Sequence, residues 1–268
     1  MATKTRNRIL LLSVPQALLI AITGIVALRS PGFYEQETKN WQAQSVGQDM
    51  MDVFLVSPLL IVSSFFSIKG NKKFAHIWAG TNLYLVYTYL IYCFDIHFNA
   101  FFIFYCIILG LSFYSVLLYL FRQMQKENDT ILTCFYPARL TGIYFIVIAC
   151  LFTFLWLSEI IPAIVQDGTP AVLLETGLFT NPVHVIDLAV FLPGLLFTGV
   201  LLMQSKPFAQ RITPIILVFM VLMDITIGLL TIVMNQRGFE SNLLLVAVMG
   251  LLAIFSLILF ISFSKRVK

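Results

Sequence analysis

Charged residues are scarce in this chain. Lys, Arg, Asp and Glu together make up only 11% of its 268 residues, whereas about 25% is usual in soluble domains. Hydrophobic residues reach 59% of the chain, and the mean hydropathy is +0.92. This composition excludes an ordinary soluble domain and predicts an integral membrane protein.

Histidine, cysteine and the familiar catalytic motifs are also lacking. The chain has only 3 His and 4 Cys, and it contains no H-E-x-x-H, Walker A loop, G-x-S-x-G or G-x-G-x-x-G motif. The cysteines show no paired C-x-x-C spacing, so neither a zinc site nor a redox pair is indicated. So few histidines exclude a histidine-rich haem or di-iron site. The four cysteines are Cys93, Cys106, Cys134 and Cys150.

Long apolar runs stand where charge is missing. Eight of them approach the length of about 20 residues that a helix needs to cross a hydrocarbon core. They are residues 9–28, 47–68, 74–94, 99–122, 139–161, 182–204, 213–234 and 242–263. The sequence therefore predicts an all-α integral membrane protein with eight transmembrane helices. We expect the first run to be retained as a span, because no small-x-small cleavage site follows it before Arg29.

The basic residues predict the orientation. If the N-terminus is cytoplasmic, all but three of the 17 Lys and Arg residues fall in cytoplasmic segments, as the positive-inside rule requires. The exceptions are Arg29, Lys39 and Arg237. Both termini are thus predicted to be cytoplasmic, in the plasma (inner) membrane. The net charge of +4 is spread over separate segments, so no nucleic-acid partner is expected.

A short pattern recurs in the second and the sixth predicted span. QDMMDVFLVSPLL and VHVIDLAVFLPGLL each contain a polar residue, an aspartate and a proline at identical spacing. The pattern comprises Asp49, Asp52 and Pro58 in one span, and His184, Asp187 and Pro193 in the other.

This recurrence predicts an internal repeat of two four-span halves, residues 1–138 and 139–268, within a single membrane domain. Because each half has an even number of spans, the halves would enter the bilayer in the same direction, as parallel repeats.

Ionisable residues inside predicted spans are candidates for function. Asp52 and Asp187 lie too far into their helices to act as simple caps, and we expect their carboxylates to approach each other across the interface between the halves. Asp49 is equally explained by a helix N-terminus, where the macrodipole favours an acid. His184 shares a helical face with Asp187. Asp224 would lie near the bilayer centre.

The prolines and the outer ends of the spans complete the predicted site. Pro58 and Pro193 are expected to kink their helices and to free backbone carbonyls. Glu159, Asp95 and His97 lie at the same outer end as Asp187.

A single divalent cation such as Zn²⁺, Mn²⁺ or Ca²⁺ could be bound by His184, Asp187 and Asp52. Side chains of this kind would need to converge from several helices.

Aromatic residues follow the third and fourth spans. Tyr84 and Tyr87 lie on one helical face, a pattern more typical of hydrogen bonds between packed helices than of a ligand site. Trp78 and Trp156 lie near span ends, where an interfacial belt of aromatic residues would place them.

Three function classes fit these features. The first is a transporter or permease of a small solute or cation, with ions coupled through Asp52, Asp187 and Asp224. The second is an enzyme at the outer leaflet, a hydrolase or transferase on a lipid-type substrate with His184 as base or metal ligand. The third is a receptor or a subunit of a membrane complex. The expected partners are the lipid bilayer and a small solute, an ion or a lipid ligand.

Overall fold

The computed structural model of the protein describes residues 2–125, 136–239 and 242–264. Within these ranges the backbone is helical apart from short connections, and no strand occurs there.

Some residues considered in the sequence lie outside the described ranges. They are Cys134 and the basic residues Lys126, Lys265, Arg266 and Lys268.

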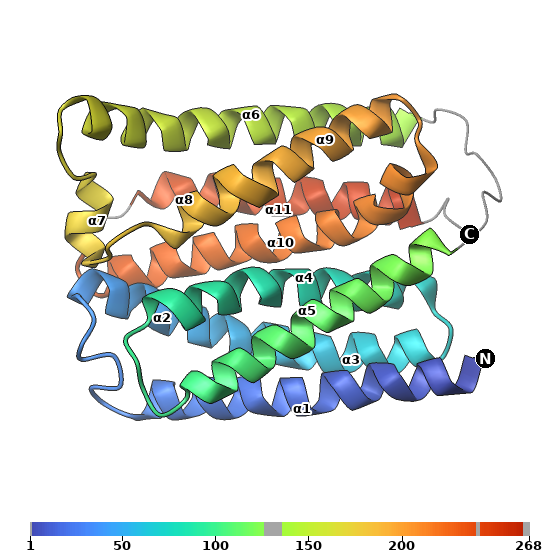
Figure 1. The fold of residues 1–268 in the computed structure, drawn as a ribbon, viewed down its shortest axis with the longest axis horizontal. Coiled ribbons are helices and arrows are strands. Elements are labelled where there is room, and N and C mark those ends of the chain that lie inside the picture. The colour runs from blue at the N-terminus through green and yellow to red at the C-terminus, as the bar shows by residue number, and fades with distance from the viewer. Residues whose placement is uncertain (1, 126–135, 240–241, 265–268) are drawn as a thin grey trace.

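Long helical segments run side by side along the length of the molecule (Figure 1). In the N-terminal half they are α1 (Ala2–Arg29), α2 (Lys39–Met51) continued by the π-helical turn η1 (Asp52–Val56) into α3 (Ser57–Ile68), α4 (Lys72–Asp95) and α5 (Phe102–Met124). In the C-terminal half they are α6 (Tyr136–Val165), the short α7 (Ala171–Thr176), α8 (Pro182–Ile186) continued by the π-helical turn η2 (Asp187–Phe191) into α9 (Leu192–Met203), α10 (Pro207–Gln236) and α11 (Leu243–Ser264).

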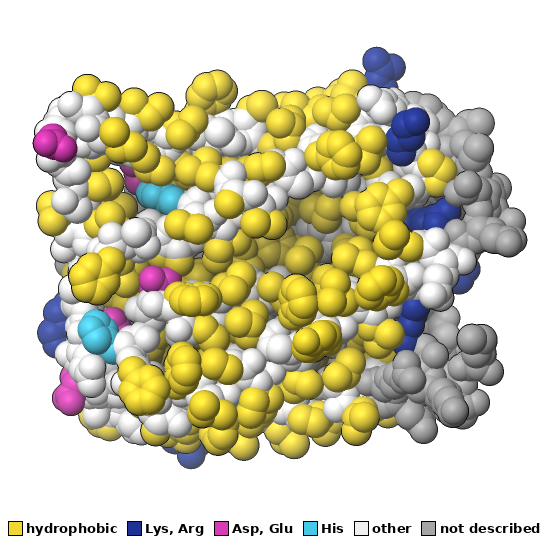
Figure 2. Space-filling view, viewed as in Figure 1, with side chains coloured by type: hydrophobic (Ala, Val, Ile, Leu, Met, Phe, Trp, Pro, Cys, Tyr) yellow, Lys and Arg dark blue, Asp and Glu magenta, His cyan; other side chains and the backbone are white. Residues whose placement is uncertain are grey.

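Seven of these segments are long and apolar enough to cross a membrane, by length and composition, within the described part of the chain. They are α1, α2 to α3, α5, α6, α8 to α9, α10 and α11. Helix α4, with 24 residues, is also long enough to cross a membrane, but it is not among these seven segments. These helices support an α-helical integral membrane protein, and Figure 2 shows the apolar surface between the two ends of the bundle.

The polar side chains visible on the face shown in Figure 2 divide between the two ends of the bundle. Most of the visible Lys and Arg side chains lie toward the end at which α1 begins and α11 finishes, which we call the basic end, and a few lie near the opposite end. The visible Asp, Glu and His side chains gather toward the opposite end, which we call the acidic end.

The two halves show the same set of helix contacts. In the N-terminal half, α1 and α4 each pack against both α3 and α5. In the C-terminal half, α6 and α10 each pack against both α9 and α11. Between the halves, α4 packs against α10, α10 against α2, and α4 against α8. The third long helix of each half therefore lies at the centre of the bundle.

The two Asp-x5-Pro patterns have the same local structure. Each aspartate begins a π-helical turn of five residues that ends just before the helix containing the proline. The N–H of Ser57 donates to the carbonyl of Asp52, and the N–H of Leu192 donates to that of Asp187. Because proline has no N–H, the regular α-helical pattern cannot continue through it. The predicted interruption is thus a π turn, a local structure frequent at functional sites.

The second helical segment begins earlier than the sequence predicted. The segment starts at Lys39 instead of residue 47, because the hydroxyl of Thr38 accepts a hydrogen bond from the N–H of Trp41 and caps the helix. Asp49 therefore lies well inside α2, so the explanation of Asp49 by a helix N-terminus is wrong. The added turns are polar but are buried against the C-terminal half, where Gly47 faces Leu230.

Gly80 allows the close approach of the two central helices. A methyl group at this position would lie 2.5 Å from the Cβ of Val218 and 2.7 Å from the carbonyl oxygen of Ile215. The contact involves backbone of α10, so a longer side chain could be accommodated only by separating α4 from α10.

We predict that Gly80→Ala will destabilise the protein by about 1–3 kcal/mol, the usual cost of overpacking a core. Thermal unfolding of the purified protein in detergent measures the effect. Gly110→Ala on α5 is the matched control, because a methyl group there meets nothing within 4 Å. Equal melting temperatures for the two variants would contradict the close α4 to α10 contact.

Candidate functional site

Asp49 is enclosed by tyrosines. Its Oδ2 accepts a hydrogen bond of 2.7 Å from the hydroxyl of Tyr34, and its Oδ1 accepts one of 2.8 Å from Tyr92. The ring of Tyr92 packs in turn on Tyr89 and Tyr105. Burial, with the charge of Asp49 as a smaller cause, raises the pKa of Tyr34 well above its usual value, so this hydroxyl remains a donor. The arrangement fixes the loop after α1 onto α2 and α4.

Asp52 belongs to a chain of polar groups that joins the two halves. The amide of Gln48 donates to Asp52 Oδ1 at 3.0 Å and to the hydroxyl of Tyr84 at 2.7 Å. The Tyr84 hydroxyl also bonds to the hydroxyl of Thr226 on α10, at 2.9 Å. Asp52 is 1% exposed, and its Oδ2 has no hydrogen-bond partner within the described ranges.

Asp187 is held by both halves. Its Oδ1 accepts a hydrogen bond of 3.1 Å from Tyr87 on α4, and its Oδ2 accepts one of 2.8 Å from the indole of Trp156 on α6. Tyr84 and Tyr87 are three residues apart on α4. The Tyr87 hydroxyl donates directly to Asp187, whereas the Tyr84 hydroxyl is linked to Asp52 through the amide of Gln48.

Asp52 and Asp187 accept their hydrogen bonds from different side chains, and the close approach of their carboxylates stays a prediction. The donor to Asp52 is Gln48, one turn earlier on the same helical segment, whereas the donors to Asp187 are Tyr87 and Trp156 on two other helices.

His184 and Glu159 face each other at the acidic end. The Nε2 of His184 lies 3.6 Å from the Oε2 of Glu159, and the His184 ring packs on Trp156 with centroids 4.6 Å apart. His184 and Asp187 thus contact the same tryptophan. The described residues contain no group of three or more His, Cys, Asp or Glu side chains able to hold a metal ion. His184, Asp187 and Asp52 accordingly do not form a common cation site.

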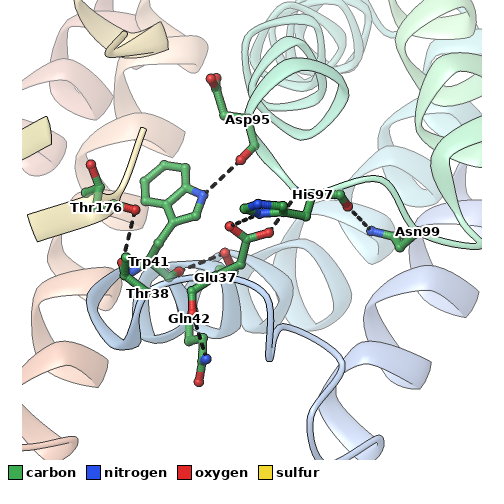
Figure 3. Close-up of polar contacts among 9 residues, drawn as sticks. Glu37, Thr38, Trp41, Gln42, Asp95, His97, Asn99 and Thr176 are labelled. Carbon is green, nitrogen blue, oxygen red and sulfur yellow. Dashed lines mark hydrogen bonds and ion pairs between the residues drawn. The ribbon is translucent and has the colours of Figure 1, made fainter. Parts of the chain in front are cut away.

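The connections after α1, α4 and α7 are joined by a separate set of polar contacts (Figure 3). The buried carboxylate of Glu37 accepts a hydrogen bond of 2.7 Å from the backbone N–H of His97 and lies 2.9 Å from its Nδ1. The indole of Trp41 donates to the carbonyl of Asp95 at 3.3 Å. The Thr38 hydroxyl donates to the carbonyl of Thr176 at 3.0 Å, which ties α7 to the start of α2. Asp95 and His97 therefore help to close the loops.

A cavity of about 600 Å³ lies between the halves, and we call it the central cavity. It extends from residues near the acidic end, such as Trp41, to Phe219 near the middle of α10. Asp187 and Asp224 both line it, and most of the remaining lining is apolar. Asp224 is 8% exposed, and its Oδ2 has no hydrogen-bond partner in the described part of the protein.

The sequence did not indicate Tyr34, Glu37 and Gln48, and it did not indicate the hydrogen bonds made by Trp78 and Trp156. Trp78 is buried and donates to the hydroxyl of Ser13 at 2.7 Å, and Trp156 binds Asp187, so neither acts only as an interfacial anchor. The polar residues that cluster on α2 immediately before Asp49 could have indicated Gln48.

Comparison with protein-family models, with curated proteins and with solved structures gave no match for this chain.

We predict that Tyr92→Phe will destabilise the protein by about 1–3 kcal/mol, because it removes one of the two donors to the buried Asp49 carboxylate. The measurement is thermal unfolding in detergent. Tyr114→Phe on α5 removes the same hydroxyl from a side chain that is 65% exposed, and it should leave stability unchanged. A tolerated Tyr92→Phe would mean that Asp49 does not depend on this bond.

Proposed function

We propose that this protein is a transporter or permease that moves a small solute or cation through the central cavity. The main support for this proposal is the position of the cavity between two halves that have matching helix contacts. Its carboxylates lie at two depths, with Asp187 near the acidic end and Asp224 deeper. Solute sites of secondary transporters typically lie between repeats, close to interrupted helices. The π turns at Asp52 and Asp187 provide such interruptions.

The topology belongs to the same proposal. We infer that α4 spans the membrane as the eighth span, that both termini are cytoplasmic, and that residues 1–138 and 139–268 are parallel repeats. The matching helix contacts and the paired π turns support the repeat. The basic end of the bundle, where α1 begins, would then face the cytoplasm. The acidic end would face the outside of the cell, as expected of a plasma-membrane protein.

Each carboxylate has a different role in this proposal. Asp187 and Asp224 face the solute, because both line the central cavity. Asp49 and Asp52 hold α2 in place through Tyr34, Tyr92 and Gln48, and they act on transport by keeping the N-terminal half rigid. Transport requires the cavity to open alternately to each side, and the α4 to α10 contact is the surface about which the halves would rock.

The enzyme and the receptor have less support. An enzyme with His184 as base would need a hydrogen-bond partner that orients the imidazole, but the Nε2 of His184 has none among the described residues and lies 3.6 Å from the half-exposed Glu159. A receptor or complex subunit accounts for the outer loops but not for a deep carboxylate in the cavity. Access to the cavity from both sides distinguishes a transporter from both alternatives.

The topology is tested by cysteine labelling in a variant without the four native cysteines. A membrane-impermeant maleimide added outside intact cells should label a cysteine at Gln36 or Gly168 and should not label one at Lys72 or Lys206. Permeabilised cells should show labelling at all four positions, because each of these residues is exposed. Labelling of Lys72→Cys in intact cells would overturn the eight-span topology with cytoplasmic termini.

Transport is tested with Met223→Cys, a position that lines the cavity one residue before Asp224. In the same background, an impermeant methanethiosulfonate should modify this cysteine both in right-side-out and in inside-out vesicles, because the cavity opens to both sides. Met51→Cys is the control, because Met51 is 2% exposed and does not line the cavity; it should react from neither side. Reaction of Met223→Cys from the outside alone would contradict transport.

A further inference from the structure

Asp224 differs from Asp49, Asp52 and Asp187 in its hydrogen bonding, and it differs from Asp95, whose Oδ2 is also buried without a partner among the described residues, in lining the central cavity. Asp49 and Asp187 each receive two hydrogen bonds and Asp52 receives one. Asp224 is 8% exposed and lines the cavity, while its Oδ2 is buried with no partner among the described residues. A buried carboxylate without donors is costly unless an opposite charge or a proton compensates it.

The charges around the cavity are of one sign. Asp187 and Asp224 are its carboxylates, and no Lys, Arg or His is among the described residues that line it. His184 lies outside the lining and is directed at Glu159. A bound anion would therefore be repelled by two carboxylates, with no basic side chain in the lining to offset them. A bound cation would be attracted by both Asp187 and Asp224.

The remaining walls suit a large apolar body. Aromatic side chains and methionines are prominent in the cavity lining, and the cavity volume of about 600 Å³ falls in the range of small-molecule sites, roughly 300–1,000 Å³. A cation held against the face of a tryptophan is attracted by the ring, and methionines adapt to ligands of different shape. The aromatic lining residues are Trp41, Tyr87, Tyr92, Phe152, Trp156, Phe191 and Phe219, and the methionines are Met220, Met223, Met234 and Met249.

We propose that the ligand of this cavity is a lipophilic organic cation, with its charge next to Asp224 and its apolar groups against the aromatic and methionine walls. The proposal deepens the proposed function, because it names the class of solute that the transporter would move. Asp187, fixed by Tyr87 and Trp156, supplies the second negative charge nearer the acidic end. Inorganic cations fit less well, because most of the lining is apolar and the described residues contain no group of three or more His, Cys, Asp or Glu side chains that could hold a metal ion.

Equilibrium binding to the purified protein in detergent tests this proposal without requiring transport. The probes are tetraphenylphosphonium and tetraphenylborate, which have the same shape and opposite charge, and the readout is quenching of tryptophan fluorescence with micelles alone subtracted. We expect tetraphenylphosphonium to bind with saturation and at least about tenfold more tightly than tetraphenylborate. Equal affinity for the two probes, tighter binding of the anion, or no saturable binding of the cation would overturn the proposal.

Asp224→Asn tests the assigned position. This variant keeps the shape of the side chain and should bind tetraphenylphosphonium about tenfold or more weakly, with an unchanged melting temperature. Asp167→Asn is the matched control, because it removes the same charge from an exposed loop residue whose positive φ of 55° suits asparagine. Wild-type affinity in folded Asp224→Asn would overturn the role of Asp224.

The two proposals fail separately. If the cation binds selectively but Met223→Cys is modified from one side only, the protein is a cation-binding receptor and transport is wrong. If Met223→Cys reacts from both sides but the two probes bind equally, transport stands and the solute is not a lipophilic cation.

Discussion

A carboxylate placed in an apolar helix bundle must receive hydrogen bonds or an opposite charge, and this requirement organises the centre of the molecule. Helix α4 supplies the hydroxyls of Tyr84, Tyr87 and Tyr92, which reach the polar groups around Asp52, Asp187 and Asp49 in turn. A helix that carries so many polar groups has to be surrounded by other helices. Its central position against α10, and its absence from the seven most clearly apolar segments, follow from the same cause.

The two halves share a local backbone structure but differ in the surroundings of their aspartates. Both place an aspartate at the start of a π turn before a proline. In the N-terminal half, tyrosines and Gln48 fill the space around the carboxylates, so Asp49 and Asp52 are enclosed. The carboxylates of Asp187 and Asp224, in the C-terminal half, instead line the central cavity between the halves.

The sequence was sufficient for features that depend on local pattern. Apolar length predicted the long helices, and Asp-x5-Pro predicted the paired interruptions, because chain length and the missing proline N–H act locally. Partner choice could not be predicted, since Asp187 binds Tyr87 and Trp156 on two helices far away in the sequence. The early start of α2 was missed because its polar first turns are buried by the other half. A cavity is space that side chains leave unfilled, so it has no signature in the residues themselves.

Asp224 is the unpaired carboxyl of the central cavity, whereas Asp49 and Asp187 accept hydrogen bonds at both oxygens and Asp52, whose Oδ2 also has no partner among the described residues, does not line the cavity. Labelling with the hydrophobic reagent dicyclohexylcarbodiimide, which forms stable adducts with buried protonated carboxyl groups, compares them within one molecule. Peptide mass spectrometry then locates the adduct. The account predicts that Asp224 is modified first and that Asp49, with hydrogen bonds to both of its oxygens, is spared. Modification of Asp49 before Asp224, or an Asp224 that stays unmodified while the other aspartates react, would contradict it.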